Sequence, residues 1–460
     1  MRVLLINPPS KDFGKIQQKC FVPISLLYLA SSLLEVGYQT TVLDVNALGL
    51  KEEETLKKIK ELNPDLIGIP LFSDIFFKTI SIIKLIKTNY PQIKILLGGP
   101  HASALPQRVL EEIREVDYIL KGEAEESIVK FCHFLEGKLN VLEVPGLYFR
   151  EDDKILSNKE NDNSKNLDKL PPPAKYLLKE LYKDKKYYLV LVKERPIDTI
   201  VTSRGCPFGC RFCSIMSKNY RALSAENVLK ELIEIYNKGI TNIDIADANF
   251  TFDRDRVMRI FKLIQKEKLN IKFRFKSRAD SIDKELVIEA KKAGAYLISL
   301  GIESGSNHIL KRMNKGIKIE QAINSCELIK KVGLKLNTGW IIGFLGETEE
   351  TIKETAKLIL KIKPTTASIN ILVPYPGTSV YEEAKATKSL MGDWSLEYKF
   401  TPWVKLAWTR SYEDLKKALK WVKKKVYLRP YYVYNFSKEI AQNLNTTLAK
   451  YAIQELMRIG

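Results

Sequence analysis

The sequence has few of the residues that mark secreted, membrane-spanning or zinc-binding proteins. It contains three histidines and six cysteines in 460 residues, and three of the cysteines fall within one short stretch. So few cysteines, so unevenly spaced, exclude a disulfide scaffold. No apolar run approaches the ~20 residues that a membrane span needs, and the N-terminus lacks the layout of a signal peptide. We therefore expect a cytoplasmic protein.

The chain has fewer acidic than basic residues: 55 aspartates and glutamates against 74 lysines and arginines, which gives a net charge of +19. Such a balance occurs in proteins that bind nucleic acid or anionic membranes. The lysines are nevertheless spread along the chain, with one denser run from Lys416 to Lys425, so the charge alone defines no binding patch. We expect no nucleic-acid partner. The chain also lacks repeats and low-complexity segments, and its length suits two or three globular domains.

The three clustered cysteines, Cys206, Cys210 and Cys213, predict an iron–sulfur site, because thiolates are the soft ligands that hold such clusters. Three ligands leave one iron of a four-iron cluster open to a non-protein ligand. Gly205 and Gly209 allow the loop to fold tightly around a bulky cluster. A zinc site is the alternative, but it needs a fourth ligand, and no second Cys or His pair follows.

Residues 1–150 predict a doubly wound parallel sheet, because short apolar strands alternate with helices. We expect strands at 2–6, 40–44, 66–70, 94–99 and 117–120, and helices at 24–35, 52–62, 76–88, 105–115 and 125–137. Ligands of such sheets bind at the carboxyl ends of the strands. No G-x-G-x-x-G follows the first strand, so a dinucleotide is not expected, whereas paired glycines suit a large, flat ligand. The candidate residues at this edge are Asn7, Pro8, Pro9, Ser73, Gly98, Gly99, Pro100, His101, Gly122 and Glu123.

Residues 151–190 are interpreted as a linker, and residues 191–385 predict a partial βα barrel of the TIM type with its site at the carboxyl ends of the strands. We expect strands at 187–192, 198–202, 242–246, 272–276, 296–300, 336–342 and 367–372, with helices at 225–237, 254–266, 284–293, 319–332 and 349–360. Glu303, beside two glycines, suits hydrogen bonds from ribose hydroxyls, and Gly343 permits an adenine to lie against the backbone. For Asp280 and Glu347 we prefer a role in capping or turn formation.

Residues 386–460 form the predicted helical cap. They contain four of the five tryptophans, many tyrosines and a basic helix expected at 415–426. Large aromatic side chains predict the core of such a cap. Two alternatives remain: a lid that faces the substrate, and a helix that touches a membrane surface and reaches a lipid-like substrate.

The cysteine stretch resembles the C-x3-C-x-Φ-C signature of the radical S-adenosylmethionine (SAM) superfamily, with Phe212 as the aromatic residue. The motifs G-I-E-S-G-S, I-I-G-F-x-G-E and P-Y-P-G-T resemble its SAM-binding barrels, although Leu345 stands where relatives often have proline. The N-terminal motifs N-P-P, P-x-x-L-x-Y-L-A, G-G-P-H and D-x-x-x-x-G-E resemble the cobalamin-binding domain of cobalamin-dependent radical SAM enzymes. The D-x-H-x-x-G motif is absent, so His101 is not expected to ligate cobalt.

This resemblance implies three cofactors: a [4Fe-4S] cluster on the three cysteines, SAM in the barrel, and cobalamin at the edge of the N-terminal sheet. The implied SAM contacts are Phe212, Asp247, Arg278, Glu303, Ser304, Ile341 and Gly343. The implied activity is C-methylation, in which a 5′-deoxyadenosyl radical removes hydrogen from an unactivated carbon and methylcobalamin supplies the methyl group.

Three other activities are alternatives to C-methylation. They are cyclisation or oxidation of a tetrapyrrole or lipid without methyl transfer, methylthio transfer, and non-enzymatic sensing of cobalamin. A methylthiotransferase would need further N-terminal cysteines, and only Cys20 and Cys132 precede the stretch. The expected partners are a small-molecule or lipid-like substrate and an electron donor such as ferredoxin or flavodoxin.

Overall fold

The computed structural model describes residues 1–10, 19–152, 154–160, 166–189, 195–215, 217–398, 400–434 and 437. The chain divides into two compact units. Unit 1 comprises residues 1–187, 375–377 and 393–401, and unit 2 comprises residues 188–374, 378–392 and 402–460. Two short pieces from late in the sequence therefore belong to the N-terminal unit.

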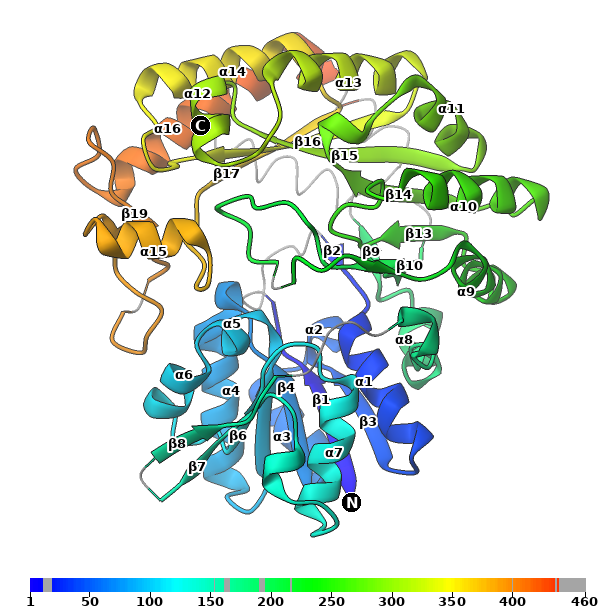
Figure 1. The fold of residues 1–460 in the computed structure, drawn as a ribbon, viewed down its shortest axis with the longest axis vertical. Helices are drawn as coiled ribbons and strands as arrows, with labels where there is room; N and C mark the ends of the chain where they lie inside the picture. The colour runs from blue at the N-terminus through cyan, green and yellow to red at the C-terminus, as the bar shows by residue number, and fades with distance from the viewer. Residues whose placement is uncertain are drawn as a thin grey trace. The chain divides into compact units, whose positions relative to one another are not determined.

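Unit 1 is built on a seven-stranded sheet with the order β3-β1-β4-β5-β6-β7-β8 (Figure 1). The first five strands in this order pair in parallel, which confirms the predicted doubly wound sheet. Central β1 and β4 are apolar and almost wholly buried, as expected for strands covered on both faces. The parallel strands are β1 Arg2–Asn7, β3 Gln39–Asp44, β4 Leu66–Pro70, β5 Lys94–Gly98 and β6 Tyr118–Leu120.

The helices of unit 1 follow these strands in alternation. They are α1 Ile24–Glu35, α2 Val45–Leu48, α3 Glu52–Leu62, α4 Phe76–Asn89, α5 Gly99–Ala104, α6 Pro106–Glu112, α7 Glu125–Leu135 and α8 Lys179–Lys183. Short 3-10 turns lie at η1 Ser73–Ile75, η2 Val141–Glu143, η3 Leu167–Lys169 and η4 Lys175–Leu178.

Two features of unit 1 differ from the sequence-based expectation. The helix expected at 105–115 forms as the shorter α6, which Pro106 starts, and an additional short helix, α5, precedes it where Gly99 turns the chain with φ +88°. His101 therefore lies in a short helix. The segment after residue 147 forms an antiparallel hairpin, β7 Leu147–Glu151 and β8 Lys154–Ser157, which extends the sheet. Arg150 anchors this hairpin by donating to main-chain carbonyls, including that of Ile113 at 2.9 Å.

Unit 2 contains an open sheet of six parallel strands in sequence order, as Figure 1 shows. In the described part of the chain no strand pairing joins β10 to β17, so the barrel is incomplete, as predicted. The strands are β10 Ile197–Ile200, β13 Asn242–Ile245, β14 Lys272–Ser277, β15 Ala295–Glu303, β16 Lys335–Ile342 and β17 Thr366–Ile371. The expected strand at 187–192 lies partly outside the described residues.

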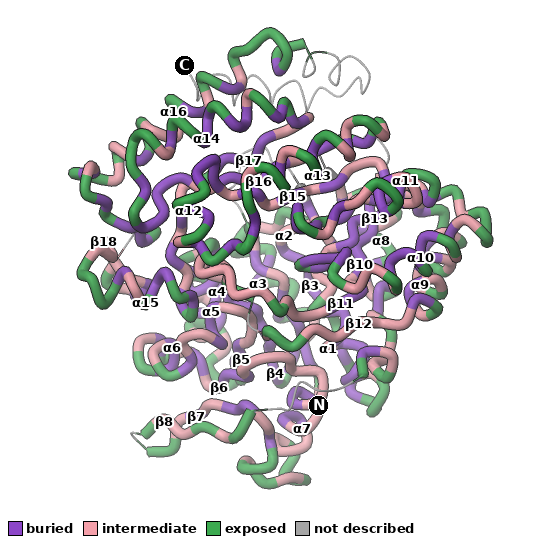
Figure 2. The backbone as a smooth tube through the Cα atoms, turned by 45° about the horizontal axis from the view of Figure 1, so that its top comes forward, coloured by how far each residue is buried: buried purple, intermediate pink, exposed green. Residues whose placement is uncertain are grey.

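The helices of unit 2 cover this sheet with alternating buried and exposed positions (Figure 2). They are α9 Ala225–Asn237, α10 Arg254–Lys266, α11 Lys284–Lys292, α12 Asn307–Arg312, α13 Ile319–Lys331, α14 Glu349–Ile362, α15 Ser379–Ala386 and α16 Tyr412–Tyr427, with the turn η5 Ala279–Ser281. The short strands of the chain, which lie outside the two large sheets, are β2 Lys19–Cys20 in residues 1–187 and, after them, β9 Tyr188–Leu189, β11 Ser203–Arg204, β12 Arg221–Ala222, β18 Leu390–Met391 and β19 Trp403–Val404.

The basic helix α16 packs beside α14 and β17 (Figure 1). Its buried residues are Leu415, Val422 and Val426, while its lysines lie on the exposed side. The predicted cap is thus described only in part, because residues 438–460 lie outside the described ranges. No helix among the described residues is long and apolar enough to span a bilayer.

Candidate functional site

The cysteine loop follows β10 and runs between β11 and β12. Cys206, Cys210 and Cys213 are half-buried, whereas the other three cysteines are buried. Burial raises the pKa of the Cys213 thiol, and the neighbouring Cys210 and Cys206 raise it further. Within the described ranges no group of three His, Cys, Asp or Glu side chains could hold a single metal ion. Three thiols on one loop suit the corners of an iron–sulfur cluster.

Gly205 and Asp247 fix the path of this loop. Gly205 has φ +79°, and a Cβ there would overlap the Asn219 carbonyl. Asp247, which follows β13, is buried and accepts hydrogen bonds from the Thr202 amide at 2.7 Å and from the Thr202 and Ser203 hydroxyls at 2.6 Å each. Asp247 is one of the expected SAM contacts, and in the structure its oxygens hold the strand that leads into the loop.

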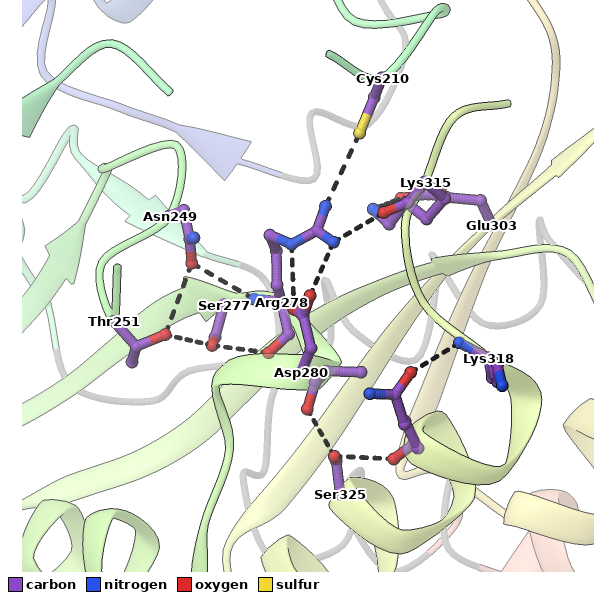
Figure 3. Close-up of polar contacts among 12 residues, drawn as sticks. Cys210, Asn249, Thr251, Ser277, Arg278, Asp280, Glu303, Lys315, Lys318 and Ser325 are labelled. Atoms are coloured by element: carbon purple, nitrogen blue, oxygen red, sulfur yellow. Dashed lines mark hydrogen bonds and ion pairs between the residues drawn. The ribbon is translucent and has the colours of Figure 1, made fainter. Parts of the chain in front are cut away.

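Arg278, at the end of β14, connects the sheet to the same loop (Figure 3). Its guanidinium donates to both carboxylate oxygens of Asp280, at 3.0 and 2.8 Å, and to the Lys315 carbonyl at 2.6 Å. The group also lies over the Phe208 ring, 3.7 Å from its centroid, and donates from Nη1 to the Cys210 sulfur at 3.8 Å. Asp280, for which we preferred capping or turn formation, instead binds the Arg278 guanidinium.

Glu303, at the end of β15, forms a nearly buried ion pair with Lys315. The Lys315 ammonium lies 2.9 Å from Glu303 Oε1, and the two side chains are 8% and 12% exposed. Glu303 has φ +74°, a left-handed conformation that costs a non-glycine residue energy and often occurs at functional sites. The Lys315 ammonium also lies 5.7 Å from the centroid of the Phe212 ring. This brings together two predicted SAM contacts, Glu303 and Phe212.

Lys315 itself was missed from the sequence. The sequence did carry a signal for it. Lys315 lies between two apolar residues, Met313 and Ile317, in a segment too short to form an exposed helix face, and the structure buries both of them. A charged residue in such a segment requires a buried partner.

The remaining predicted SAM contacts lie on β15 and β16 and on the turns that follow them. Ser304 is fully buried, and its hydroxyl accepts the Ser306 amide hydrogen at 3.2 Å. Ile341 is half-buried. Gly343 has φ +93° and donates its amide hydrogen to the Glu347 carboxyl. Glu347 therefore braces this turn, as we preferred from the sequence.

The predicted edge of unit 1 carries two groups of polar contacts. The order β3-β1-β4 places the reversal of the chain between β1 and β4, and in sheets of this kind ligands bind beside that point at the carboxyl ends of the strands. On one side Asn7 donates to Asp44 at 2.8 Å, and Pro8 and Pro9 follow. On the other side Ser73 and His101 are hydrogen bonded at 2.8 Å.

The other predicted residues of this edge lie around α5. Gly98 and Gly99 lead into the helix beside Pro100, and a Cβ at Gly99 would stand 3.0 Å from the Leu71 carbonyl oxygen. Gly122, which precedes half-buried Glu123, donates its amide hydrogen to the Ser103 hydroxyl of α5 at 3.1 Å. These candidates therefore lie after β4, β5 and β6, while Asn7 ends β1 and Pro8 and Pro9 follow it.

His101 lies in an aromatic environment that the sequence did not predict. Its ring centroid is 4.7 Å from that of Phe76 and 5.8 Å from that of Trp394, whose indole stacks on Tyr375. Burial lowers the pKa of His101 to about 4, and the positive charge of Arg108 lowers it further, so the ring is neutral at physiological pH. Its Nε2 is buried with no hydrogen-bond partner among the described residues.

Trp394 reaches His101 because residues 393–401 pack on α6. Arg108 binds Asp393 at 2.8 Å and Glu112 at 2.7 Å, and the Leu396 amide donates to Glu112 at 3.1 Å. We call residues 393–401 the strap. It was predicted as part of the C-terminal cap, but it belongs to unit 1.

Comparison with known proteins decides the family. Residues 200–359 match the radical SAM superfamily, and residues 17–131 match the B12 binding domain. The chain is 30% identical over 466 residues to a protein of Pyrococcus horikoshii named Uncharacterized methyltransferase PH0819, with 100% of this chain and 98% of the relative covered. The chain belongs to the cobalamin-dependent radical SAM enzymes.

Other relatives of this radical SAM enzyme agree with the assignment. It is 28% identical over 394 residues to the anaerobic magnesium-protoporphyrin IX monomethyl ester cyclase of Rubrivivax gelatinosus, covering 83% of this chain and 70% of the relative. Its fold resembles that of OxsB, a cobalamin-dependent SAM radical enzyme solved with aqua-cobalamin and SAM bound. The TM-score is 0.79 at 22% identity, with 99% of this chain and 71% of OxsB covered.

The cofactors of this radical SAM enzyme are a [4Fe-4S] cluster, SAM and cobalamin. The donor sets described above fit them. Three half-buried thiols stand together on one loop, and a strained Glu303 lies beside Lys315 at the strand ends. The edge of unit 1 offers glycine-lined backbone and a neutral histidine whose Nε2 is unpaired among the described residues.

Proposed function

We propose that this enzyme is a C-methyltransferase that places a methyl group on an unactivated carbon. The observation that carries the proposal is the full-length likeness to a protein named as a methyltransferase. Relatives named cytidylyl-2-hydroxyethylphosphonate methyltransferase, of Streptomyces wedmorensis, and hopanoid C-3 methylase, of Methylococcus capsulatus, support it at 25% identity each. When bound, the cofactors supply one electron, a hydrogen-abstracting radical and a methyl group; the chain binds and orients them.

In this proposal the cluster is held by Cys206, Cys210 and Cys213. Asp247 and Gly205 keep the loop in place, so their role is positioning. Glu303 and Lys315 present the charges at which the polar part of SAM binds. Further SAM contacts are proposed for Phe212, Arg278, Ser304, Ile341 and Gly343, and for Asp247 besides its positioning role. Arg278 has four of its five N–H groups already engaged.

Cobalamin is proposed to bind at the carboxyl edge of the sheet in unit 1. The contacts are Asn7, Pro8, Pro9, Ser73, Gly98, Gly99, Pro100, His101, Gly122 and Glu123. His101 Nδ1 is hydrogen bonded to Ser73, and aromatic rings surround the imidazole. We propose that His101 shapes the wall of this site and does not ligate cobalt. In the electron paramagnetic resonance spectrum of Co(II) cobalamin, His101→Ala should therefore cause no loss of nitrogen hyperfine structure.

The proposed activity is tested by mass spectrometry of metabolites from an anaerobic, cobalamin-fed host that overproduces the enzyme. One metabolite should gain the mass of CH₂, and a host that produces the Cys206→Ala, Cys210→Ala, Cys213→Ala triple variant should lack that product. In vitro, the reconstituted wild type should cleave SAM to 5′-deoxyadenosine with dithionite, and the triple variant should not. Cleavage by the triple variant would overturn the assignment of the cluster ligands.

Cyclisation without methyl transfer is the second candidate, because relatives named as cyclases match most of the chain. The same experiment separates the two reactions. A cyclase product loses hydrogen or gains oxygen instead of CH₂, and a methylthiotransferase product gains CH₂S.

Several further properties belong to this proposal. The domain boundaries of 1–150, 151–190, 191–385 and 386–460, the cytoplasmic location, and ferredoxin or flavodoxin as the reductant are carried forward from the sequence. Membrane contact through α16 is tested with anionic vesicles. Because its lysines are exposed, vesicle binding should weaken as the salt concentration rises. Membrane contact is contradicted if the vesicles do not bind, or if binding does not depend on salt.

A further inference from the structure

We infer that Arg278 sets the reduction potential of the cluster through its contact with the Cys210 sulfur, and that Asp280 opposes this effect. The inference rests on the proposed function in one respect, because it takes Cys210 as a cluster ligand.

The guanidinium of Arg278 is held in one orientation by four separate contacts. Asp280 accepts two parallel hydrogen bonds, the Lys315 carbonyl accepts a third, and the Phe208 ring covers one face. These partners engage Nε, Nη2 and the flat face of the group, and Nη1 is left to point toward Cys210 Sγ at 3.8 Å (Figure 3). The orientation is therefore fixed by the surroundings and does not depend on the weak contact with sulfur.

Burial makes this orientation matter electrostatically. Arg278 is 5% exposed, so water screens its charge little. A cluster becomes more negative when it accepts an electron, and a positive donor close to one of its sulfurs stabilises that reduced form. Asp280 is 23% exposed and carries the opposite charge. Because Nη1 faces the sulfur while the carboxylate binds the opposite edge of the guanidinium, the positive end of the pair lies nearer to the cluster.

A purely structural role is the competing explanation. Phe208 and Cys210 both belong to the cysteine loop, so Arg278 also ties that loop to β14. A tie of this kind would affect how much cluster is bound and would leave the potential of the bound cluster unchanged. The midpoint potential therefore separates the two roles.

The test uses full-length enzyme, reconstituted anaerobically without SAM, and follows reduction of the cluster by dithionite in an EPR-monitored redox titration. The variants are Arg278→Lys and Asp280→Asn. Lysine keeps the charge but offers a compact ammonium that cannot reproduce the fork toward Asp280 and also reach Cys210. We expect Arg278→Lys to lower the ratio of reduced to oxidised cluster at a fixed potential at least tenfold, which is about 59 mV for a one-electron couple.

Asp280→Asn should move the ratio in the opposite direction, because it removes the compensating charge while the Lys315 carbonyl and the Phe208 ring still hold the arginine. Arg254→Lys is the matched control. Arg254 also binds carboxylates, Asp283 at 2.8 Å and Glu285, but it is 42% exposed and, among the described residues, none of its ion pairs involves the loop. This variant should keep the potential of the wild type.

Opposite shifts in the two variants support the inference, and unchanged potentials at full iron content overturn it. If Arg278→Lys fails to hold a cluster, Asp280→Asn decides alone, and an unchanged or lowered potential then overturns the inference. A wild type that binds no cluster would instead overturn the proposed function, so the two failures are distinguishable.

Discussion

Replacing Glu347 with glutamine is expected to stabilise the protein at neutral and alkaline pH. The Glu347 side chain is 2% exposed at the turn after β16, where it accepts the Gly343 amide hydrogen. Burial raises the pKa of its carboxyl group to about 8, against the smaller opposite effect of hydrogen bonds from the Gly343 and Phe344 backbone. Glutamine has the shape of the protonated carboxyl and never ionises. The variant therefore keeps the turn and removes a proton equilibrium.

The sign of the effect follows from proton binding. Between 4.5, the usual pKa of Glu, and about 8, the native protein holds a proton that the unfolded chain has released. The stability contributed by this group is full below pH 4.5 and is lost as the pH rises through 8. At about 1.4 kcal/mol for each pH unit between the two values, the loss is roughly 3 kcal/mol at pH 7, and its upper limit is roughly 5 kcal/mol.

The measurement is urea unfolding of the reduced full-length chain at pH 5, 6, 7 and 8. The free energy of unfolding of Glu347→Gln minus that of the wild type should grow by roughly 3 kcal/mol from pH 5 to pH 8. Glu349→Gln is the control, since this neighbouring glutamate is exposed in the first turn of α14, and its curve should run parallel to that of the wild type. A constant difference between Glu347→Gln and the wild type across this range would refute the buried proton.

Three other substitutions test the site and the strap. Gly205→Ala should lower iron incorporation and cost on the order of 1–3 kcal/mol, because φ is +79° and the new Cβ would overlap a carbonyl; iron content and thermal unfolding report both. Lys315→Met should destabilise by about 3 kcal/mol or more, since it leaves Glu303 unpaired in a nearly buried position, and it should weaken SAM binding in calorimetry. Arg108→Ala should cost only about 1 kcal/mol but should open residues 393–401 to limited proteolysis, because it removes an ion pair that anchors them.

The regular elements of both units were predictable, because local pattern determines them. α10 was expected at 254–266 and forms there, and the strands of unit 2 agree within a few residues. Alternating apolar periodicity carries this information without reference to the rest of the chain. The additional helix α5 was missed because it depends on the backbone conformation at Gly99.

Contacts between distant segments were not predictable, because no local pattern encodes them. The sequence gives no sign that the strap returns to unit 1, since its anchor is an ion pair between residues 285 positions apart, Arg108 and Asp393. Arg278 was expected to contact SAM because it follows a barrel strand. Its engagement with Cys210 appears only once the cysteine loop is folded against β14.

The polar residues at the strand ends of unit 2 therefore divide into two kinds. Asp247 and Glu347 are buried and bind backbone amides, so they fix the turns on which ligands would rest. Glu303 differs, because its Oε1 binds the Lys315 ammonium at 2.9 Å. A carboxylate has about four lone-pair sites, so one that binds a lysine can still accept a hydroxyl, and this is what binding of the SAM ribose at Glu303 would require.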